Sequence, residues 1–422
     1  MLQVPYWYAY IIFCILCCAY FLVSFQRLCL GIIASDIAVE LGFGPVLLGW
    51  LGAGFHYSYA LCQIPGGYII DRYGPRVPLS LFFGLIGGIG SYAFACANSF
   101  GTSVVARILV GIGMSIVTAS SLKTISYYFS SRKYMRLVSI FFAIGGVGML
   151  FSAAPLAFLN KLYGWRSIFL VVSLITCVCG LGFWFMLKGL ALKKDNRFIT
   201  ERYKKNLSFL LAVKTLFSSK HFLLILAWYI TASSIFFSFA SLWAGPYYMS
   251  TFDLSSNQVG SLLSFGIIGV IIGTPVGAWL SEKMDSRKKV ITLASILALL
   301  GSALLYLITG TSEYFLPYIS FALICLSGNI GVSVIYTLLK DSIPIQLIGT
   351  STAIMSSTLF ILTACLQMVI GYLLEFLSHG SDQLPYDKVF IIYGILAFLS
   401  LFLSLRLDEA PQHSQRIPGS SL

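Results

Sequence analysis

Charged side chains are scarce in this chain. Only 10% of its 422 residues are Asp, Glu, Lys or Arg, whereas 58% are hydrophobic. Soluble domains are about a quarter charged, so this composition excludes an ordinary soluble enzyme. A bilayer core needs about 20 apolar residues for each helical crossing, and long apolar runs fill nearly the whole sequence. We therefore expect a multi-pass membrane protein, with the lipid bilayer as one of its partners.

The sequence also lacks any pattern of metal ligands or paired cysteines. Its ten cysteines all fall in apolar runs, where a thiol behaves as a small hydrophobe. The net charge is +12, but the basic residues sit in the links between apolar runs and form no patch interleaved with aromatics. We expect no metal, no cofactor and no nucleic-acid partner, and we expect a monomer.

Apolar runs long enough to cross a bilayer recur twelve times. Windows of about 19 residues place them at 7-34, 46-70, 79-97, 102-128, 135-159, 167-188, 221-247, 257-281, 289-309, 314-339, 349-376 and 386-406. The one long polar segment lies between the sixth and the seventh. The sequence thus predicts a first six-helix bundle over 1-188, a basic cytoplasmic linker over 189-220, a second bundle over 221-408 and a cytoplasmic tail over 409-422.

The two halves resemble each other. Pro65 and Gly67 at the end of the second span have counterparts in Pro275 and Gly277 at the end of the eighth, half a chain length further on. A duplicated six-span unit is typical of secondary transporters, which bind substrate near the midplane between the two repeats. The expected fold is an all-α membrane protein with twelve transmembrane helices in two six-helix pseudo-symmetric bundles.

The positions of Lys and Arg predict the orientation of the chain. Of 27 basic residues, 21 lie in the links and tail on one side. Because cytoplasmic loops carry the excess of Lys and Arg, this side is the cytoplasmic one, and both termini lie there. A cell membrane is the expected location, and a bacterial inner membrane is the simplest choice.

A glycine-rich loop joins the second and third spans. It contains Gly67, Asp71, Arg72, Gly74 and Arg76 in the order GxxxDRxGPR. The loop resembles the signature loop of the major facilitator superfamily, and this resemblance implies the major facilitator fold. Physically, Gly67 would let neighbouring helices approach, Gly74 would permit a tight turn, and Asp71 would accept hydrogen bonds from a helix N-terminus or an Arg. Such a latch would form in one conformation and break in another.

The second half and the fourth span extend this resemblance. After Gly277 the corresponding loop has no Asp at the matching position, but Glu282 and Arg287 follow closely. The fourth span begins with Arg107 and Gly111, in a pattern similar to a second motif of the superfamily. In that motif of the superfamily, an Arg faces the interior of the bundle beside a helix contact lined by glycine.

Three cations lie at membrane depth, whereas no carboxylate occupies the middle of any predicted span. Ionisable groups there are costly and persist mainly where they line a cavity or find a partner. A positive site without acids predicts an anionic substrate. Arg27 is the leading ligand candidate. Arg107 is better explained by a structural role between helices, and Lys123 is equally compatible with a side chain that reaches back to the headgroups.

Polar and aromatic residues complete the candidate site. His56 lies in the second span and is the one group there whose ordinary pKa is close to physiological pH, so it is a candidate for carrying a coupled proton. The other candidates for contact with substrate are Gln26, Tyr59, Trp243, Asn329 and Gln367. Each of these residues could instead serve packing.

The first half also resembles the anion:cation symporter branch of the superfamily, which takes up sugar acids and other organic anions. The resemblance rests on Arg27 in the first span and on the segment YALCQIPGGYIIDRYGPR. That branch usually has an Asp before the Arg and an acid in the fourth span. Here Gln26 stands before Arg27, and Met114 and Ser115 replace the acid, so proton coupling through a carboxylate does not carry over.

We therefore expect alternating-access transport of a small organic anion or zwitterion, with a proton or sodium ion as the coupling partner. One alternative is a uniporter or exporter of peptides or siderophore-like metabolites in the same fold. Another is a membrane sensor that does not transport. An enzyme is disfavoured, because the sequence has no HExxH motif and no acid pair within a span.

Overall fold

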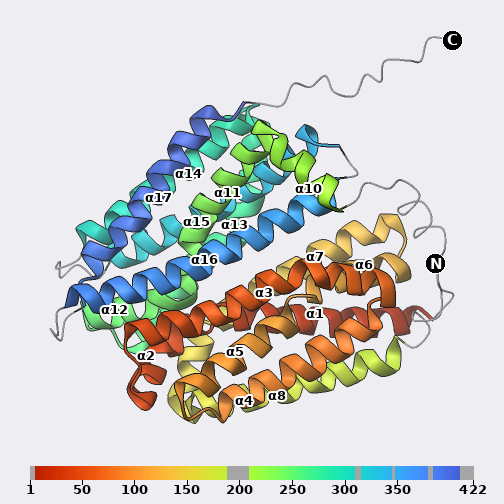
Figure 1. The fold of residues 1–422 in the computed structure, drawn as a ribbon, viewed down its shortest axis with the longest axis horizontal. Coiled ribbons are helices and arrows are strands. Elements are labelled where there is room, and N and C mark those ends of the chain that lie inside the picture. Colours follow the sequence, from red (N-terminus) through yellow and green to blue (C-terminus); the bar gives the residue numbers. More distant parts are fainter. Residues whose placement is uncertain (1–4, 188–208, 309–314, 345–346, 379–383, 409–422) are drawn as a thin grey trace.

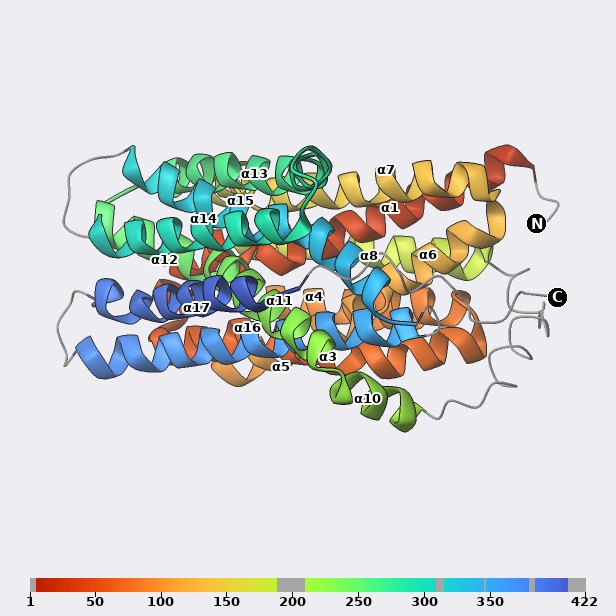
Figure 2. The same cartoon turned by 90° about the horizontal axis from the view of Figure 1, so that it is seen from above.

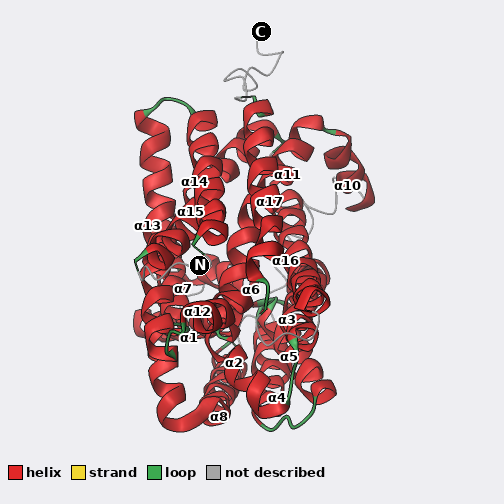
Figure 3. Ribbon diagram, turned by 90° about the vertical axis from the view of Figure 1, so that its left-hand side faces the viewer, coloured by secondary structure: helices red, strands yellow, loops and turns green. Residues whose placement is uncertain are grey.

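A computed structural model describes residues 5–187, 209–308, 315–344, 347–378 and 384–408. Within these ranges every regular element is a helix, and loops make up the rest (Figure 3). The helices form two bundles that lie side by side, the first coloured red to yellow and the second green to blue (Figure 1). The predicted all-α fold of two bundles is confirmed.

The first bundle is built from nine described elements, several of which join end to end. They are α1 (Tyr6–Leu28), α2 (Leu30–Leu41), α3 (Pro45–Tyr73), η1 (Pro78–Gly87), α4 (Gly88–Ala95), α5 (Phe100–Met114), α6 (Val117–Tyr128), α7 (Ser131–Phe151) and α8 (Ala154–Met186). The first crossing is α1 continued by α2, the third is η1 continued by α4, and the fourth is α5 continued by α6.

The second bundle repeats this plan. After α10 (Phe209–Ser218) come α11 (Lys220–Ser238), η3 (Phe239–Trp243), α12 (Ala244–Phe252), α13 (Ser256–Lys283), α14 (Arg287–Leu307), α15 (Leu316–Ser342), α16 (Ile348–Ser378) and α17 (Tyr386–Arg406). The seventh crossing is α11, η3 and α12 in series. Most of the predicted linker, and the whole predicted tail over 409-422, lie outside the described residues.

The element α8 contains parts of two crossings, which are divided by a kink at Gly164. Gly164 has a non-helical φ of 73°, so the residues before it complete the fifth crossing and those from Trp165 onward form the sixth. Such a positive φ costs glycine little. By length and composition alone, eleven described helical runs could cross a membrane. The remaining crossing is α3, whose 29 residues are less apolar because they include His56 and several tyrosines and glycines.

The two bundles touch most closely at one end, which we call the α2 end and which carries α2, α12 and the last turns of α16 (Figure 1). A Cβ built on Gly31 of α2 would lie 2.2 Å from the carbonyl oxygen of Ala240, and one built on Gly245 would lie 1.9 Å from that of Gly31. The backbones are therefore in direct contact.

Two polar contacts add to this closure. The backbone N–H of Val46, at the start of α3, donates to the Glu375 carboxylate of α16 at 3.1 Å. The backbone N–H of Ala154, at the start of α8, donates to Ser264 Oγ of α13 at 3.0 Å. In the view from above, α13 lies alongside α7 of the other bundle (Figure 2). In this conformation the α2 end is sealed between the halves.

Candidate functional site

Arg27 lies in the last turn of α1, between the two bundles, and only 7% of its surface is exposed. One Nη atom donates a hydrogen bond to the Tyr59 hydroxyl at 3.0 Å, while Nε has no partner. The guanidinium lies 5.0 Å from the ring centre of Phe360 and 5.9 Å from that of Phe237. No carboxylate among the described residues forms an ion pair with it.

A group of buried polar atoms without partners lies at the same interface. His56 Nδ1 lies 3.2 Å from the Gly52 carbonyl oxygen, and its Nε2 has no hydrogen bond. The Gln367 side chain of α16 lies beside His56. Gln367 donates to Ser241 Oγ at 2.7 Å, whereas its amide oxygen has no partner. The indole N–H of Trp243 is also buried without an acceptor.

The structure thus gathers side chains from both halves in one place. Arg27, His56 and Tyr59 come from the first bundle and Gln367 comes from the second, whereas the Trp243 ring lies nearer the α2 end, beside Gly371 of α16 and the start of α3. Buried polar groups are normally hydrogen-bonded, so unpartnered ones in a cluster need an explanation. A ligand with one negative group and several hydroxyl or carboxyl oxygens would satisfy them.

Arg107 has a different environment from Arg27. It is almost fully buried, and its guanidinium donates to the side-chain oxygen of Gln26 at 3.3 Å and to the Gln26 carbonyl at 3.4 Å. It also lies 4.7 Å from the ring centre of Phe55. The Gln26 amide nitrogen in turn donates to Ser91 Oγ at 3.0 Å. The Gln26 side chain is therefore engaged in packing, and Arg107 joins α5 to the end of α1.

Lys123 and Asn329 are held by helix backbones. Lys123 Nζ donates to the Ile70 carbonyl, in the last turn of α3, at 3.1 Å. The Asn329 amide donates to the Cys325 carbonyl of its own helix at 2.9 Å, and its Cβ faces Gly273 of α13. Their polar atoms serve helix packing in this conformation and not the cluster around Arg27.

The signature loop agrees only in part with the expectation. Gly74 has φ of 72°, as a tight turn requires, and Arg76 donates to the Trp184 carbonyl at 3.0 Å and stacks on its ring. Arg72 donates to the Tyr68 hydroxyl at 3.3 Å. Nothing lies within 4 Å of a Cβ built on Gly67, so the expected close approach of helices is absent there. The side chain of Asp71 lies outside the described residues.

The other motif positions show close helix contacts. A Cβ on Gly277 would lie 2.0 Å from the Ile330 carbonyl of α15, and one on Gly111 would lie 2.5 Å from the Phe55 carbonyl of α3. Arg287 forms an ion pair with Asp341 at 2.5 Å. Glu282, which follows the position of the missing Asp in this loop, is exposed.

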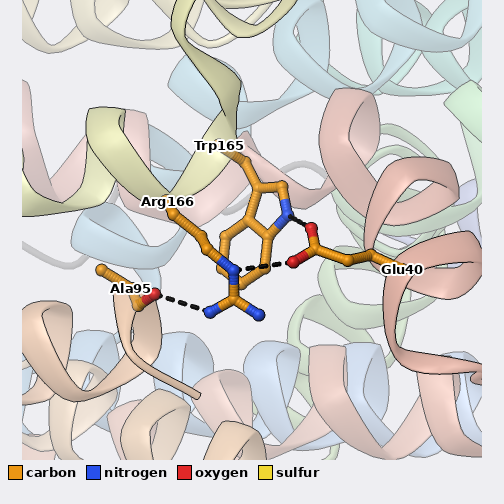
Figure 4. Close-up of polar contacts among 4 residues, drawn as sticks. All are labelled: Glu40, Ala95, Trp165 and Arg166. Atoms are coloured by element: carbon orange, nitrogen blue, oxygen red, sulfur yellow. Dashed lines mark hydrogen bonds and ion pairs between the residues drawn. The ribbon is translucent and has the colours of Figure 1, made fainter. Parts of the chain in front are cut away.

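A polar staple fastens three crossings of the first bundle at the α2 end (Figure 4). Glu40 of α2 accepts hydrogen bonds from Arg166 Nε at 2.7 Å and from the Trp165 indole at 2.6 Å. Arg166 also donates to the Ala95 carbonyl at 2.7 Å. Hydrogen bonding to the Arg166 guanidinium holds the pKa of the Glu40 carboxyl below its ordinary range, and the indole N–H adds to this effect. The staple makes α2 a rigid part of its bundle.

Sequence reasoning missed the aromatic neighbours of Arg27 and the partner of Gln367. These neighbours are Phe237, Phe360 and Ser241. Phenylalanine and serine are common in this chain, which has 33 phenylalanines. Nothing in their spacing separates them from packing residues. One member of the staple could have been noticed in the sequence, because Arg166 is one of few basic residues in the links on the predicted outer side.

Two helical bundles with a buried polar cluster between them are typical of membrane transporters. The chain belongs to the Major Facilitator Superfamily. The model of that family matches residues 16–364, with a second match over 230–421. This family is one of transporters, so the expectation that the protein is not an enzyme is confirmed.

Curated relatives match along most of their length. A probable sulfoacetate transporter of Cupriavidus necator is 23% identical over 412 residues, which cover 92% of each chain. The D-galactonate transporter of Escherichia coli is 21% identical over 400 residues, covering 89% of this chain and 91% of that one. The hexuronate transporter of Escherichia coli is 18% identical over 416 residues, covering 90% and 93%.

Solved structures share the fold. A D-xylose-proton symporter superposes with a TM-score of 0.73 at 14% identity, covering 96% of this chain and 98% of that one. A bacterial homologue of the human lysosomal transporter Spinster, in an inward-facing and unoccupied conformation, gives 0.70 at 16% identity, covering 96% and 95%. At these identities the likeness concerns the fold.

Proposed function

We propose that the protein transports a small organic anion and that Arg27 binds the negative group. The observation that carries this proposal is a buried guanidinium between the two halves that has no acidic partner among the described residues and donates only to the Tyr59 hydroxyl, whereas Arg107 lies within the first bundle and donates twice to Gln26. A lone buried cation is unfavourable unless something compensates it. A carboxylate or sulfonate that enters from water would supply this compensation through charge-assisted hydrogen bonds.

The neighbouring orphan atoms suggest what the rest of the substrate offers. The Gln367 amide oxygen and the His56 Nε2 lie on neighbouring side chains, and neither has a hydrogen bond of normal geometry. Hydroxyl groups donate and accept, so a hydroxylated acid could satisfy both. The names of the relatives, which refer to sulfoacetate, D-galactonate and hexuronate, support an organic acid as the substrate class. Peptides or siderophore-like metabolites are the alternative substrates.

The same proposal includes the membrane arrangement. The linker over 189-220 joins bundles over 1-188 and 221-408, and the basic side of the chain faces the cytoplasm together with both termini. The α2 end is then the outer end, and a bacterial inner membrane is the location. We propose that the protein acts as a monomer.

For the coupling ion we propose a proton carried by His56, with sodium as the alternative. His56 is buried next to Gln367, on the second half, and its Nε2 is free. A His56→Gln variant should lose accumulation driven by an acidic exterior while it retains exchange of substrate for substrate in proteoliposomes. Retained accumulation would exclude this role.

The proposed function is tested by binding. Purified protein is titrated with sulfoacetate, D-galactonate and the neutral sugar D-xylose, and thermal stabilisation reports binding to the folded state. Hydrogen bonds to charged groups contribute about 1.5–3 kcal/mol each, so Arg27→Gln should weaken anion binding at least about tenfold. Arg136→Gln, which removes an equal charge from an exposed site on α7, is the matched control. Stabilisation by D-xylose alone would refute the anion proposal.

A further inference from the structure

Phe360 lies at the centre of the contacts around Arg27. Its ring centre is 5.0 Å from the Arg27 guanidinium, 5.0 Å from the Tyr59 ring and 5.8 Å from the His56 ring, on which it stacks. Phe237 lies 5.4 Å from Phe360 and 5.9 Å from the guanidinium. Phe360 is 4% exposed. It thus covers the cation in the protein without substrate.

The contact crosses between the two halves. Arg27, His56 and Tyr59 belong to α1 and α3, whereas Phe237 and Phe360 belong to α11 and α16. The first half therefore supplies the cation and one ring on it, that of Tyr59 at 5.2 Å, and the second half supplies the two phenylalanine rings. Any motion that separates the halves around this point must break these contacts.

The physical effect of the rings is to stabilise a charge that has no counter-ion. The face of an aromatic ring is electrically negative, and a desolvated cation–π contact changes an equilibrium constant by roughly a factor of 30. An anion bound to Arg27 supplies the same compensation more strongly. An anion binds a guanidinium through its N–H groups, and the Nε of Arg27 is buried without a partner in this conformation, so the packed rings must move before an anion reaches it and the rings and the anion compete.

We propose that Phe360, assisted by Phe237, is an aromatic cover that occupies the anion's place on Arg27 in the empty transporter and withdraws when the substrate binds. Phe360 is then a specificity residue of the second half, because only a ligand that interacts with Arg27 more favourably than the ring displaces it. Neutral solutes fail this requirement. The inference rests on the proposed function of Arg27 as the anion ligand.

The first test needs no ligand. Thermal unfolding of wild-type protein, Arg27→Met, Phe360→Leu and the double variant forms a double-mutant cycle. We expect the two changes to be non-additive, because each removes the same cation–π contact. Phe390→Leu, which alters a buried phenylalanine of α17, replaces Phe360→Leu in a control cycle and should be additive with Arg27→Met. Additivity in both cycles would overturn the proposal.

The second test measures competition. Titration with sulfoacetate and D-galactonate should show binding to Phe360→Leu about ten- to thirtyfold tighter than to wild type, because the competing ring is gone. Phe390→Leu should bind as wild type does. Weaker binding to Phe360→Leu would make Phe360 a substrate contact and would overturn its role as a cover. If Arg27→Gln binds these anions as well as wild type does, the proposed function itself fails, whatever Phe360→Leu does.

Discussion

The seal between the halves at the α2 end depends on the absence of one side chain. Gly31 and Ala240 are so close that a Cβ on Gly31 would lie 2.2 Å from the Ala240 carbonyl oxygen. Real Cβ atoms do not approach an atom closer than 3.0 Å. A Gly31→Ala substitution therefore requires α2 and η3 to separate by nearly an ångström. We predict that this change opens the α2 end and shifts the transporter away from the conformation described here.

The size of the shift follows from the cost of overpacking. Forcing an extra methyl group into a close-packed contact costs about 1–3 kcal/mol, and each 1.4 kcal/mol is a factor of ten in an equilibrium constant. The population with a sealed α2 end should fall by about 5- to 150-fold relative to the open one. Alanine also favours helix over glycine by about 1 kcal/mol, so the stability of α2 itself should not suffer.

Spin labels measure this shift directly. In a variant without native cysteines, labels at Val39 of α2 and Asn257 of α13, both exposed at this end on opposite halves, report the separation by pulsed electron resonance. Gly31→Ala should populate longer distances. Gly101→Ala is the control, because nothing lies within 4 Å of its Cβ. An unchanged distance distribution in Gly31→Ala would refute the reasoning that backbone contact at Gly31 seals this end.

Three further predictions concern single side chains. Arg107→Met leaves the Gln26 amide oxygen without its buried donor and should destabilise the protein by about 1–3 kcal/mol, measured by thermal unfolding. Trp243→Phe removes an N–H that has no acceptor and shrinks a side chain that is 1% exposed, so the melting temperature should fall because a cavity is left, and anion binding should weaken about two- to tenfold through loss of the donor. Because the folded pKa of Glu40 is lowered, its contribution is present above the ordinary carboxyl pKa of about 4.3 and is lost as pH falls through the folded value. Glu40→Gln should therefore unfold with a smaller pH dependence in acid than wild type, and an equal dependence would exclude the Arg166 staple as its source.

The sequence predicts the architecture because apolar runs and loop charges are set by the bilayer. The twelve crossings, the two bundles and the positions of the buried arginines all follow from what a membrane excludes. The breaks are harder to predict. The irregular turn at Cys29 between α1 and α2 keeps helical dihedrals and lies two residues before Gly31, and it accompanies the bonds from Arg107 to Gln26, which are tertiary contacts.

Only those members of the candidate site that belong to residue types rare in membrane spans could be predicted from the sequence. Arg27 and His56 stand out because cations and imidazoles are uncommon in an apolar segment. Phe360 is one phenylalanine among 33, and only its position in space makes it a neighbour of Arg27. Lys123 and Asn329 were equally conspicuous in sequence, yet each bonds a helix carbonyl. A polar residue within a membrane span indicates a free-energy cost of burial, and only the structure shows which contacts offset that cost.

The contrast between the two buried arginines links stability to function. Arg107 donates to both the side-chain oxygen and the carbonyl of Gln26, although its Nε, like that of Arg27, has no partner. Arg27 follows Gln26 directly on α1, and its hydrogen bond goes to the Tyr59 hydroxyl at the boundary between the halves. By fixing Gln26, Arg107 fixes the turn of helix from which Arg27 projects, so one cation positions the other. This arrangement holds the second cation in a defined place, so the aromatic rings packed on Arg27 have to move when an anion binds, whereas the cation itself does not.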